Sequence, residues 1–413
     1  MNTAVGDTVF VARQPIFDKQ KAVQAYELLF RSGLENRYTG TSGDISTLDL
    51  IASSLLVIGL DELTGRKRAF INFTRNLLLQ ETADLLPSDR VTVEIIEDIQ
   101  PDDEVLAACR KLKDAGYPIA LDDFVLSNMG TPFLDLADIV KVDFLGTPPE
   151  DRARIAEELG RRNITALAEK VETIEDFAAA AAAGYTLFQG YFFSKPVIQT
   201  GNRITSNRLT QFRLLNEVTR PDFSYDQLEG IMKQDVALTY HLMKYINSVW
   251  FALRHEVTSI KHALVLLGPA EIRKWAALMS LRHMGSDKPS ELFLRSITRA
   301  RMGECLAPHI GMKAQAPDLF LMGMFSLIDA LLDMPMADIL PKLPLAEPVS
   351  KALLGQPSLF RAANDTIVAY ERGDWDSFAT ASKELQLDTQ IMPSLFSGSL
   401  RWANQAFGVF LAA

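Results

Sequence analysis

The sequence of 413 residues contains few of the residues that build disulfide frameworks or zinc sites. It has only two cysteines, Cys109 and Cys305, which lie far apart, and only five histidines. Neither cysteine has a second Cys or a His at the spacing of metal ligands, so a zinc knuckle and a disulfide framework are both excluded. Such low cysteine usage favours a reducing, cytoplasmic setting.

Long apolar stretches and a signal peptide are also missing. The most apolar segments, such as 51–60, contain serine and are much shorter than the roughly 20 residues needed to span a bilayer. The first residues lack the basic segment and continuous apolar stretch of a signal peptide. We therefore expect a soluble protein with no direct membrane contact.

Positive charge is in deficit, because 42 Lys and Arg residues against 52 Asp and Glu give a formal net charge of −10. Affinity for nucleic acid comes mainly from clustered basic residues that neutralise phosphates, so we expect no direct nucleic-acid partner. An acidic protein can still bind a small anion when metal ions supply the positive charge. The length and the hydrophobic fraction of 48% indicate two or three folded domains.

In the first half of the chain, short β-branched segments alternate with amphipathic helical segments. The predicted strands are 9–16, 23–30, 69–73, 91–96, 118–124, 139–144, 164–170 and 187–189. The predicted helices are 45–58, 75–85, 102–115, 149–161 and 174–183. This alternation favours a closed, TIM-like (β/α)8 barrel, with an open doubly wound sheet as the alternative. Only residues 17–22 join the first two strands, too few for a parallel crossover, so one strand is expected to be antiparallel.

The second half is helical almost throughout. Residues 197–211 are polar and are predicted to form a linker, which gives expected domains of 1–200 and 201–413. A capping box at 224–227 predicts a helix start there. Further predicted helices are 236–246, 260–267, 271–282, 292–306, 319–331, 336–340, 348–354 and 375–413, the last with breaks at Pro393 and Gly398. We expect an all-α second domain.

Polar side chains interrupt the apolar strands of the first half near their ends. They are Glu27, Asn72, Glu94, Asp122, Asp123, Lys141, Glu169 and Gln189. The C-terminal ends of barrel strands meet at one mouth, where active sites lie. Clustered carboxylates are unfavourable unless cations neutralise them, and their oxygens suit a pair of Mg²⁺ or Mn²⁺ ions, which can catalyse phosphodiester hydrolysis. Taken singly, each acid has a structural alternative, and Lys141 could be a salt-bridge partner inside the barrel.

The motifs around these residues resemble those of EAL domains, the cyclic di-GMP phosphodiesterases. The signature is YELLFR at 26–31, with Leu28 in place of the family's Ala, and QPI at 14–16 lies upstream. Matching segments follow in the family's order: INF at 71–73, VEIIE at 93–97, LDDF at 121–124, VKVD at 140–143, AEKVET at 168–173 and QGY at 189–191. The resemblance covers roughly residues 9–196.

The resemblance implies two divalent cations, Mg²⁺ or Mn²⁺. One would be held by Glu27, Asn72, Glu94 and Asp122, and the other by Asp122, Asp123 and Glu169. In the same way, Glu27, Asp123, Glu169, Lys141 and Glu172 would form the catalytic set.

Within that set, Lys141 would orient the attacking water and Glu172 would support the loop after Asp123. Gln14, Arg31 and Gln189 would contact the substrate or its water. The implied reaction is hydrolysis of cyclic di-GMP to linear pGpG.

Two departures from the EAL pattern keep a second hypothesis open. After Phe124, active members usually continue with a Gly-Thr-Gly-Tyr-Ser-Ser loop, whereas this chain has VLSNMG at 125–130. Ile96 also replaces a common Thr beside Glu94. The alternative to an active phosphodiesterase is a catalytically weak or inactive domain that acts as a cyclic di-GMP receptor or a scaffold. A sugar-processing barrel is less favoured, because the acids do not form an isolated pair. A homodimer is possible by resemblance.

The helical half resembles HDOD domains. The matching segments are QDVALT at 234–239, LMKYINS at 242–248 and SIKHALVLLG at 259–268. Where metal-dependent HD phosphohydrolases place a His-Asp pair, this chain has Ser326 and Leu327, so we expect no metal site in this half. Asn247 and Ser248 are interpreted as a helix-terminating cap. The order of domains resembles the bacterial EAL–HDOD signalling family, with the HDOD domain as a non-catalytic module for an unidentified protein partner.

Overall fold

The computed structural model describes residues 9–32, 59–80, 82–194, 214, 216–218, 220, 224–233, 236–247, 257–284, 288–343 and 345–411. These residues form two compact units. The first comprises the barrel up to Phe193 together with the short segment Tyr370–Asp376, and the second comprises Ser194–Ala369 and Ser377–Ala413. The predicted domain boundary at 200/201 and the predicted linker both lie outside the described residues.

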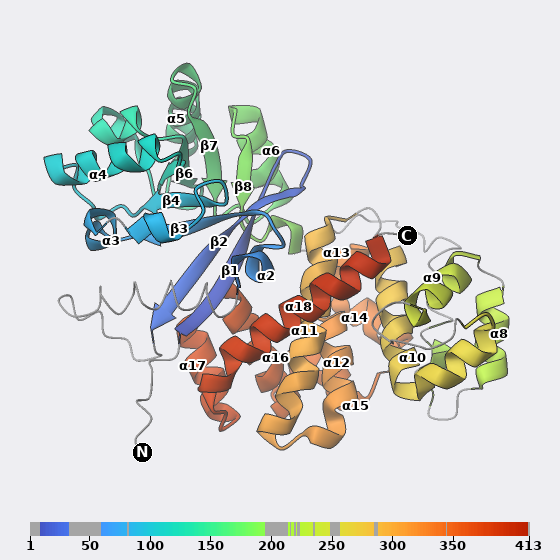
Figure 1. Cartoon of the computed structure of the whole chain (residues 1–413). Helices are drawn as coiled ribbons and strands as arrows, with labels where there is room; N and C mark the ends of the chain where they lie inside the picture. The colour runs from blue at the N-terminus through green and yellow to red at the C-terminus, as the bar shows by residue number, and fades with distance from the viewer. Residues whose placement is uncertain are drawn as a thin grey trace, which may run out of the picture. The chain divides into compact units, whose positions relative to one another are not determined.

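Eight strands close into a barrel in the first unit, which confirms the predicted fold (Figure 1). They are β1 (Val9–Phe17), β2 (Val23–Ser32), β3 (Arg68–Phe73), β4 (Val91–Ile95), β5 (Ile119–Leu121), β6 (Ile139–Asp143), β7 (Thr165–Glu169) and β8 (Leu187–Gln189). The strand β1 is antiparallel to both of its neighbours, and the other pairs are parallel. The tight turn after β1 explains this direction, because the side chain of Asp18 accepts hydrogen bonds from the backbone of Gln20 and Ala22.

Helices cover the outside of the barrel. They are α2 (Leu60–Thr64), α3 (Arg75–Leu79), α4 (Asp103–Asp114), α5 (Pro149–Arg161) and α6 (Ile174–Ala183). The predictions for α5 and α6 are confirmed at both ends, and Gly184 ends α6 in the left-handed conformation. The predicted helix 75–85 is wrong as one element, because α3 ends at Leu79 and a separate 3-10 turn covers Thr82–Leu85. The predicted helix 45–58 lies outside the described residues.

The loop after β5 follows its own path. This strand is shorter than predicted and ends at Leu121, so Asp122 and Asp123 lie just beyond it. Asp123 adopts a positive φ of 41°, which is uncommon for a residue other than glycine. A 3-10 helix, Leu126–Gly130, then occupies the segment where the sequence departs from the EAL pattern.

The second unit is all helical within its described residues, as predicted. Its helices are α8 (Tyr225–Lys233), α9 (Val236–Ile246), α10 (Ile260–Met284), α11 (Ser290–Leu306), α12 (Ala316–Phe325), α13 (Ile328–Leu332), α14 (Met336–Ile339), α15 (Glu347–Leu353), most of α16 (Leu359–Arg372) and α17 (Trp375–Glu384), and α18 (Met392–Leu411). The end of α16 and the start of α17 belong to the first unit. Helix α11 packs against α12 and α18. Gly303 and Gly323 permit the close approach of α11 and α12, since a side chain at either would collide with the backbone of the other helix.

Several expectations for this unit need correction. The sequence pattern missed α16 entirely. The predicted helix 319–331 is divided near Ser326 into α12 and α13. The predicted gap between the helices 260–267 and 271–282 corresponds to a kink within α10 at Gly268, where φ is 70°. Gly398 does not break α18, and Pro393 occupies its first turn, where a missing N–H is tolerated.

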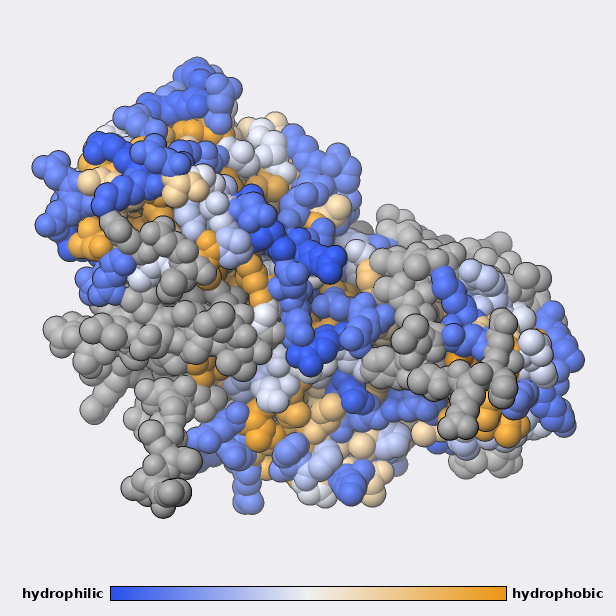
Figure 2. Space-filling view, in the orientation of Figure 1, coloured by the Kyte–Doolittle hydropathy of each residue, from blue (hydrophilic) through white to orange (hydrophobic). Residues whose placement is uncertain are grey.

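The outer surface of the barrel unit is mostly hydrophilic in the view of Figure 2, for example over the upper part of the unit where α5 lies in Figure 1. Helix α4 shows how this arises, because its apolar residues Val105, Leu106, Cys109 and Leu112 are buried and its charged residues face outward. Among the described residues, no helix is long and apolar enough to cross a membrane.

Candidate functional site

The polar residues of the barrel form a layer directly above an apolar layer. Ala25, Phe70, Ala120 and Leu167 belong to one buried core cluster inside the barrel, with Ile16. On each of these four chain segments the residue two positions later is polar, namely Glu27, Asn72, Asp122 and Glu169. Since strand side chains alternate between faces, residues two apart share a face. The sequence therefore places these polar side chains at one end of the barrel interior.

Lys141 lies at the centre of this layer and is almost completely buried. Its Nζ lies 3.3 Å from Glu27, 3.0 Å from Asp122 and 2.8 Å from Glu169, and it also forms an ion pair with Glu94. Three strands, β2, β4 and β7, and the loop after β5 thus place carboxylates around one ammonium group of β6. The ammonium offsets part of the repulsion among the carboxylates, as a buried charge cluster requires.

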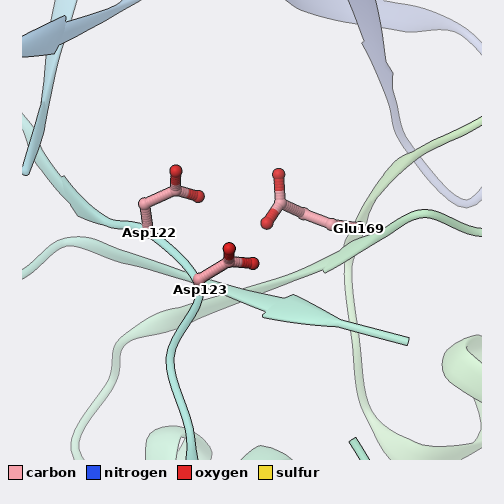
Figure 3. Close-up of side chains that lie close together, drawn as sticks. All are labelled: Asp122, Asp123 and Glu169. Carbon is pink, nitrogen blue, oxygen red and sulfur yellow. The ribbon is translucent and has the colours of Figure 1, made fainter. Parts of the chain in front are cut away.

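A second group of carboxylates lies beside the first. One ligand oxygen each from Asp122, Asp123 and Glu169 can be chosen so that all lie within 4.8 Å of one another. Figure 3 shows the three carboxyl groups pointing toward a common space, with Asp122 and Asp123 on one chain segment and Glu169 on another. A divalent cation accepts oxygen ligands of this kind. These are the three residues that the resemblance assigns to the second cation.

Amide side chains complete the layer. Asn72 Nδ2 donates to Glu27 Oε1 at 3.2 Å, and Gln189 Nε2 donates to Glu27 Oε2 at 2.6 Å. Gln189 Nε2 also lies 2.9 Å from Gln14 Oε1, which accepts from it. The predicted substrate residue Gln14 is thereby joined through Gln189 to the predicted metal ligand Glu27.

A cavity of about 340 Å³ opens above this layer. Most of the predicted site residues line it: Gln14, Glu27, Asp122, Asp123, Lys141, Glu169, Glu172 and Gln189. Asn72 and Glu94 do not line the cavity themselves. Asn72 is hydrogen-bonded to the lining residue Glu27, and Glu94 forms an ion pair with the lining residue Lys141. Arg31 does not line the cavity, although it lies on β2 at the same parity as Glu27.

Burial and neighbouring charges shift the titration of these groups. Burial raises the pKa of Glu94 well above its ordinary range and raises that of Glu169 to about 8, against the attraction of Lys141. Burial would also raise the pKa of Asp122, but the charge of Lys141 holds it below the ordinary value. Lys141 itself is buried, yet four carboxylates keep its pKa well above the ordinary value. Burial and the charge of Asp122 raise the pKa of Asp123.

The sequence pattern missed Lys170. This residue lines the cavity, and its Nζ lies 2.7 Å from Asp143 and 3.7 Å from Asp123. It therefore links the loop after β5, the end of β6 and the segment that follows β7. Its position directly after Glu169, at a strand end, could have indicated a site residue. An ordinary surface lysine would have the same pattern in sequence, and Lys170 is half-exposed. Leu145 was also missed, and it is one of the exposed apolar residues at the cavity.

The donor set fits divalent cations. The buried oxygens of the site that receive no hydrogen bond from the described residues include Asn72 Oδ1 and Glu94 Oε2. Buried acceptors of this kind are costly unless another group satisfies them. Both belong to the predicted ligand set, and carboxylate and amide oxygens are the ligands that Mg²⁺ and Mn²⁺ prefer.

The raised pKa of Glu169 makes the stability of the metal-free protein depend on pH. The carboxyl group binds its proton more tightly in the folded state, where its pKa is about 8, than at its ordinary value of 4.5. Its stabilising contribution is therefore complete below pH 4.5 and is lost as the pH rises through 8. In EDTA, the free energy of unfolding of Glu169→Gln should increase relative to that of the parent by about 1–3 kcal/mol as the pH rises from 5 to 8. Urea denaturation across this range measures the difference.

Glu157→Gln, an exposed glutamate on α5, serves as the control and should follow the parent at every pH. A constant difference between Glu169→Gln and the parent over this range would contradict the raised pKa.

In the helical unit, the residues singled out by the HDOD resemblance have structural contacts. The side chain of Asn247 donates to the carbonyl of Val257 and accepts from its N–H, so these bonds join a later segment rather than the end of α9, where the sequence predicted a cap. Ser248 lies outside the described residues. Ser326 accepts a hydrogen bond from Arg299 and donates to the carbonyl of Gly323 at the end of α12. Leu327 is buried.

Comparison with protein families finds two domains in this chain. The model of the EAL domain matches residues 44–196, and the model of the HDOD domain matches residues 208–342. Two full-length relatives are each 35% identical. The uncharacterized protein YuxH of Bacillus subtilis aligns over 96% of this chain and 98% of its own length, and the cyclic di-GMP phosphodiesterase CdgJ of Vibrio cholerae over 96% and 93%.

Solved structures also resemble part of the chain. The calcium and cyclic di-GMP complex of BlrP1 from Klebsiella pneumoniae is 25% identical over 48% of this chain, with a TM-score of 0.39, and the match spans 58% of that chain, less than two thirds of its length. A standalone EAL protein from Vibrio cholerae O395 in its c-di-GMP-bound form is 24% identical over 46% of this chain and 93% of its own, with a TM-score of 0.35.

The closed barrel with one antiparallel strand and the matching domain model define an EAL domain in the first half of the chain. With the HDOD domain after it and two relatives aligned over nearly its whole length, the chain belongs to the EAL–HDOD family.

Proposed function

We propose that the barrel hydrolyses cyclic di-GMP to linear pGpG with two divalent cations, Mg²⁺ or Mn²⁺, bound at the strand ends. The observation that carries this proposal is the convergence of Glu27, Glu94, Asp122 and Glu169 on Lys141, with Asp123 beside them, at the floor of the cavity. The relative CdgJ, whose name gives it this activity, supports the choice of substrate.

Electrostatics favour a metal-dependent reaction over direct binding of the anion. Among the described residues, five acidic side chains and two lysines line the cavity. A phosphodiester would be repelled by this wall unless cations offset the charge. We assign one cation to Glu27, Asn72, Glu94 and Asp122 and the other to Asp122, Asp123 and Glu169. Bound there, the cations would activate water and stabilise the attacking and leaving oxygens.

The protein side chains supply position and charge. Asn72 and Gln189 fix the two oxygens of Glu27, so this carboxylate has a defined orientation. The ammonium of Lys141 would hold the attacking water once cations share its carboxylate partners. Gln14 lies at the cavity wall, where its amide can reach the nucleotide. Glu172 would support the loop after Asp123, and Arg31 would contact the substrate from the rim of β2.

The second candidate is a cyclic di-GMP receptor or scaffold without turnover. It is favoured by the 3-10 helix Leu126–Gly130, which replaces the glycine-containing loop of active EAL domains directly after Asp123. In either case the helical domain is a non-catalytic module for a protein partner. A cytoplasmic location and a homodimer remain predictions from the sequence.

The proposal is tested by incubating the full-length protein with cyclic di-GMP and Mn²⁺ and separating the products by chromatography. We expect pGpG to accumulate, and we expect Glu169→Ala to lower the rate by about 10³-fold, since it removes a ligand of the second cation. Binding of cyclic di-GMP in calorimetry without product after long incubation would select the receptor, and the absence of both binding and product would reject the proposal.

A further inference from the structure

The segment Tyr370–Asp376 packs with the barrel although it lies far beyond β8 in the sequence. Tyr370 and Trp375 contact Phe10 of β1, with ring centroids 6.3 and 6.0 Å away, and they contact each other at 5.6 Å. Tyr370 and Phe10 are both buried. This aromatic cluster fixes the segment on the β1–β2 hairpin. The segment also lies outside residues 44–196, which match the EAL domain model.

Gly373 lies at the tightest point of this packing. It has a φ of 68°, which glycine adopts more readily than other residues. A Cβ atom there would lie 3.0 Å from Leu29 Cδ1 and 3.5 Å from Ala12 Cβ. Leu29 lines the cavity, so the segment packs directly against a residue of the cavity wall.

Arg372 contacts two residues of the cavity wall. Its backbone carbonyl accepts a hydrogen bond from Gln14 Nε2 at 3.3 Å. Its guanidinium lies over the ring of Tyr191, with Cζ 4.7 Å from the ring centroid. Gln14 and Tyr191 both line the cavity, at the side where β1 and β8 meet.

The orientation of Gln14 follows from its two partners. A carbonyl can only accept a hydrogen bond, so the Nε2 group must face Arg372 and Oε1 must face Gln189. Gln189 in turn donates to Glu27. A continuous hydrogen-bonded series therefore runs from Arg372 through Gln14 and Gln189 to a predicted metal ligand.

We propose that Arg372 is a positioning residue for the nucleotide-binding side of the cavity, an inference that rests on the proposed function. Its carbonyl fixes the amide of Gln14, and its guanidinium holds the ring of Tyr191. A fixed aromatic ring beside an amide suits a purine nucleotide, because a base stacks on the ring and hydrogen-bonds to the amide. The EAL site of this chain is thus completed by a segment from outside its EAL domain model.

The experiment measures the Kd of cyclic di-GMP by calorimetry with Ca²⁺, and separately the Kd of Mn²⁺ alone, using full-length variants. Arg372→Ala should raise the nucleotide Kd about 5- to 20-fold, in the range of a cation–π contact, and leave the Mn²⁺ Kd within twofold. Arg372→Lys, which keeps a cation over the ring, should restore the nucleotide Kd to within threefold of the parent. In the turnover assay, the KM of Arg372→Ala should rise, whereas its kcat should stay within threefold of the parent value.

Two further variants separate positioning from a general structural effect. Arg361→Ala removes another arginine of α16, one that pairs with Asp365 in the helical unit, and should leave both Kd values unchanged. In a Tyr191→Leu background, Arg372→Ala should lose most of its effect, since the contact no longer exists.

An unchanged nucleotide Kd in folded Arg372→Ala, or an equal change in the Mn²⁺ Kd, would overturn the role of Arg372 while the proposed function stands. If the parent protein binds Mn²⁺ but not cyclic di-GMP, the proposed function fails and this inference fails with it.

Discussion

Lys141→Met should destabilise the metal-free protein by about 3–5 kcal/mol, the cost of removing one partner from a buried charge cluster. The ammonium is the shared cation of Glu27, Glu94, Asp122 and Glu169, and its side chain is 1% exposed. Without it, these carboxylates must either repel one another or bind protons. Urea denaturation in EDTA at pH 7.5, followed by circular dichroism, measures the loss.

Two conditions should reduce this loss. At pH 5 the destabilisation should be smaller, because Glu169, whose pKa burial raises to about 8, is then protonated. Saturating Mn²⁺ should also restore part of the stability if it binds the same carboxylates. These conditions keep the test informative even if the variant does not fold at neutral pH.

Lys113→Met provides a matched control. Lys113 forms a 2.6 Å ion pair with Asp138, but both side chains are about one third exposed, so the expected loss is about 0–1 kcal/mol. A loss for Lys141→Met as small as that of Lys113→Met would show that the central ammonium is dispensable.

Glu27→Gln should reduce kcat/KM for cyclic di-GMP by about 10³-fold, because it removes a charged ligand of the first cation and keeps the shape of the side chain. Glutamine can still accept the hydrogen bond from Asn72, but its NH2 group would then face the donors Gln189 Nε2 and Lys141 Nζ, so circular dichroism must first show that the variant is folded. The same variant should bind Mn²⁺ more weakly in calorimetry by about 10-fold or more. The two measurements together assign the effect to the cation.

The control is Glu104→Gln, an exposed glutamate of α4 that pairs with Arg75. Its kcat/KM and Mn²⁺ affinity should equal those of the parent. Full activity of Glu27→Gln would contradict the ligand role of Glu27. If the parent protein shows no turnover but Glu27→Gln still binds Mn²⁺ more weakly than the parent, the result would instead agree with the receptor hypothesis.

The two hypotheses for this EAL domain differ in the loop after Asp123 rather than in the carboxylates. All the predicted ligands occupy one end of the barrel interior, which suits either hypothesis. The loop departs from the family pattern and forms a 3-10 helix after a residue with positive φ. In the proposed two-cation site, the backbone of that loop would set the position of the second cation and so decide between the two hypotheses.

Much of the barrel could be predicted because its signals are local. Helix α6 begins at the capping residue Thr173 and ends at Gly184, and both signals are visible in the sequence. Helix α16 was missed, although its sequence is amphipathic. Gly398 suggested a break in α18, but packing in the tertiary structure outweighs the roughly 1 kcal/mol that a glycine costs in a helix.

The set of side chains at the barrel mouth can be read from the sequence. Strand alternation places Glu27, Asn72, Asp122 and Glu169 two residues after the core residues Ala25, Phe70, Ala120 and Leu167, so the polar layer follows from a period of two. The contacts of those side chains depend on the tertiary fold. The four carboxylates around Lys141, the bridge made by Lys170, and the contacts of Arg372 with Gln14 and Tyr191 join residues distant in the chain, and no local pattern specifies such pairs.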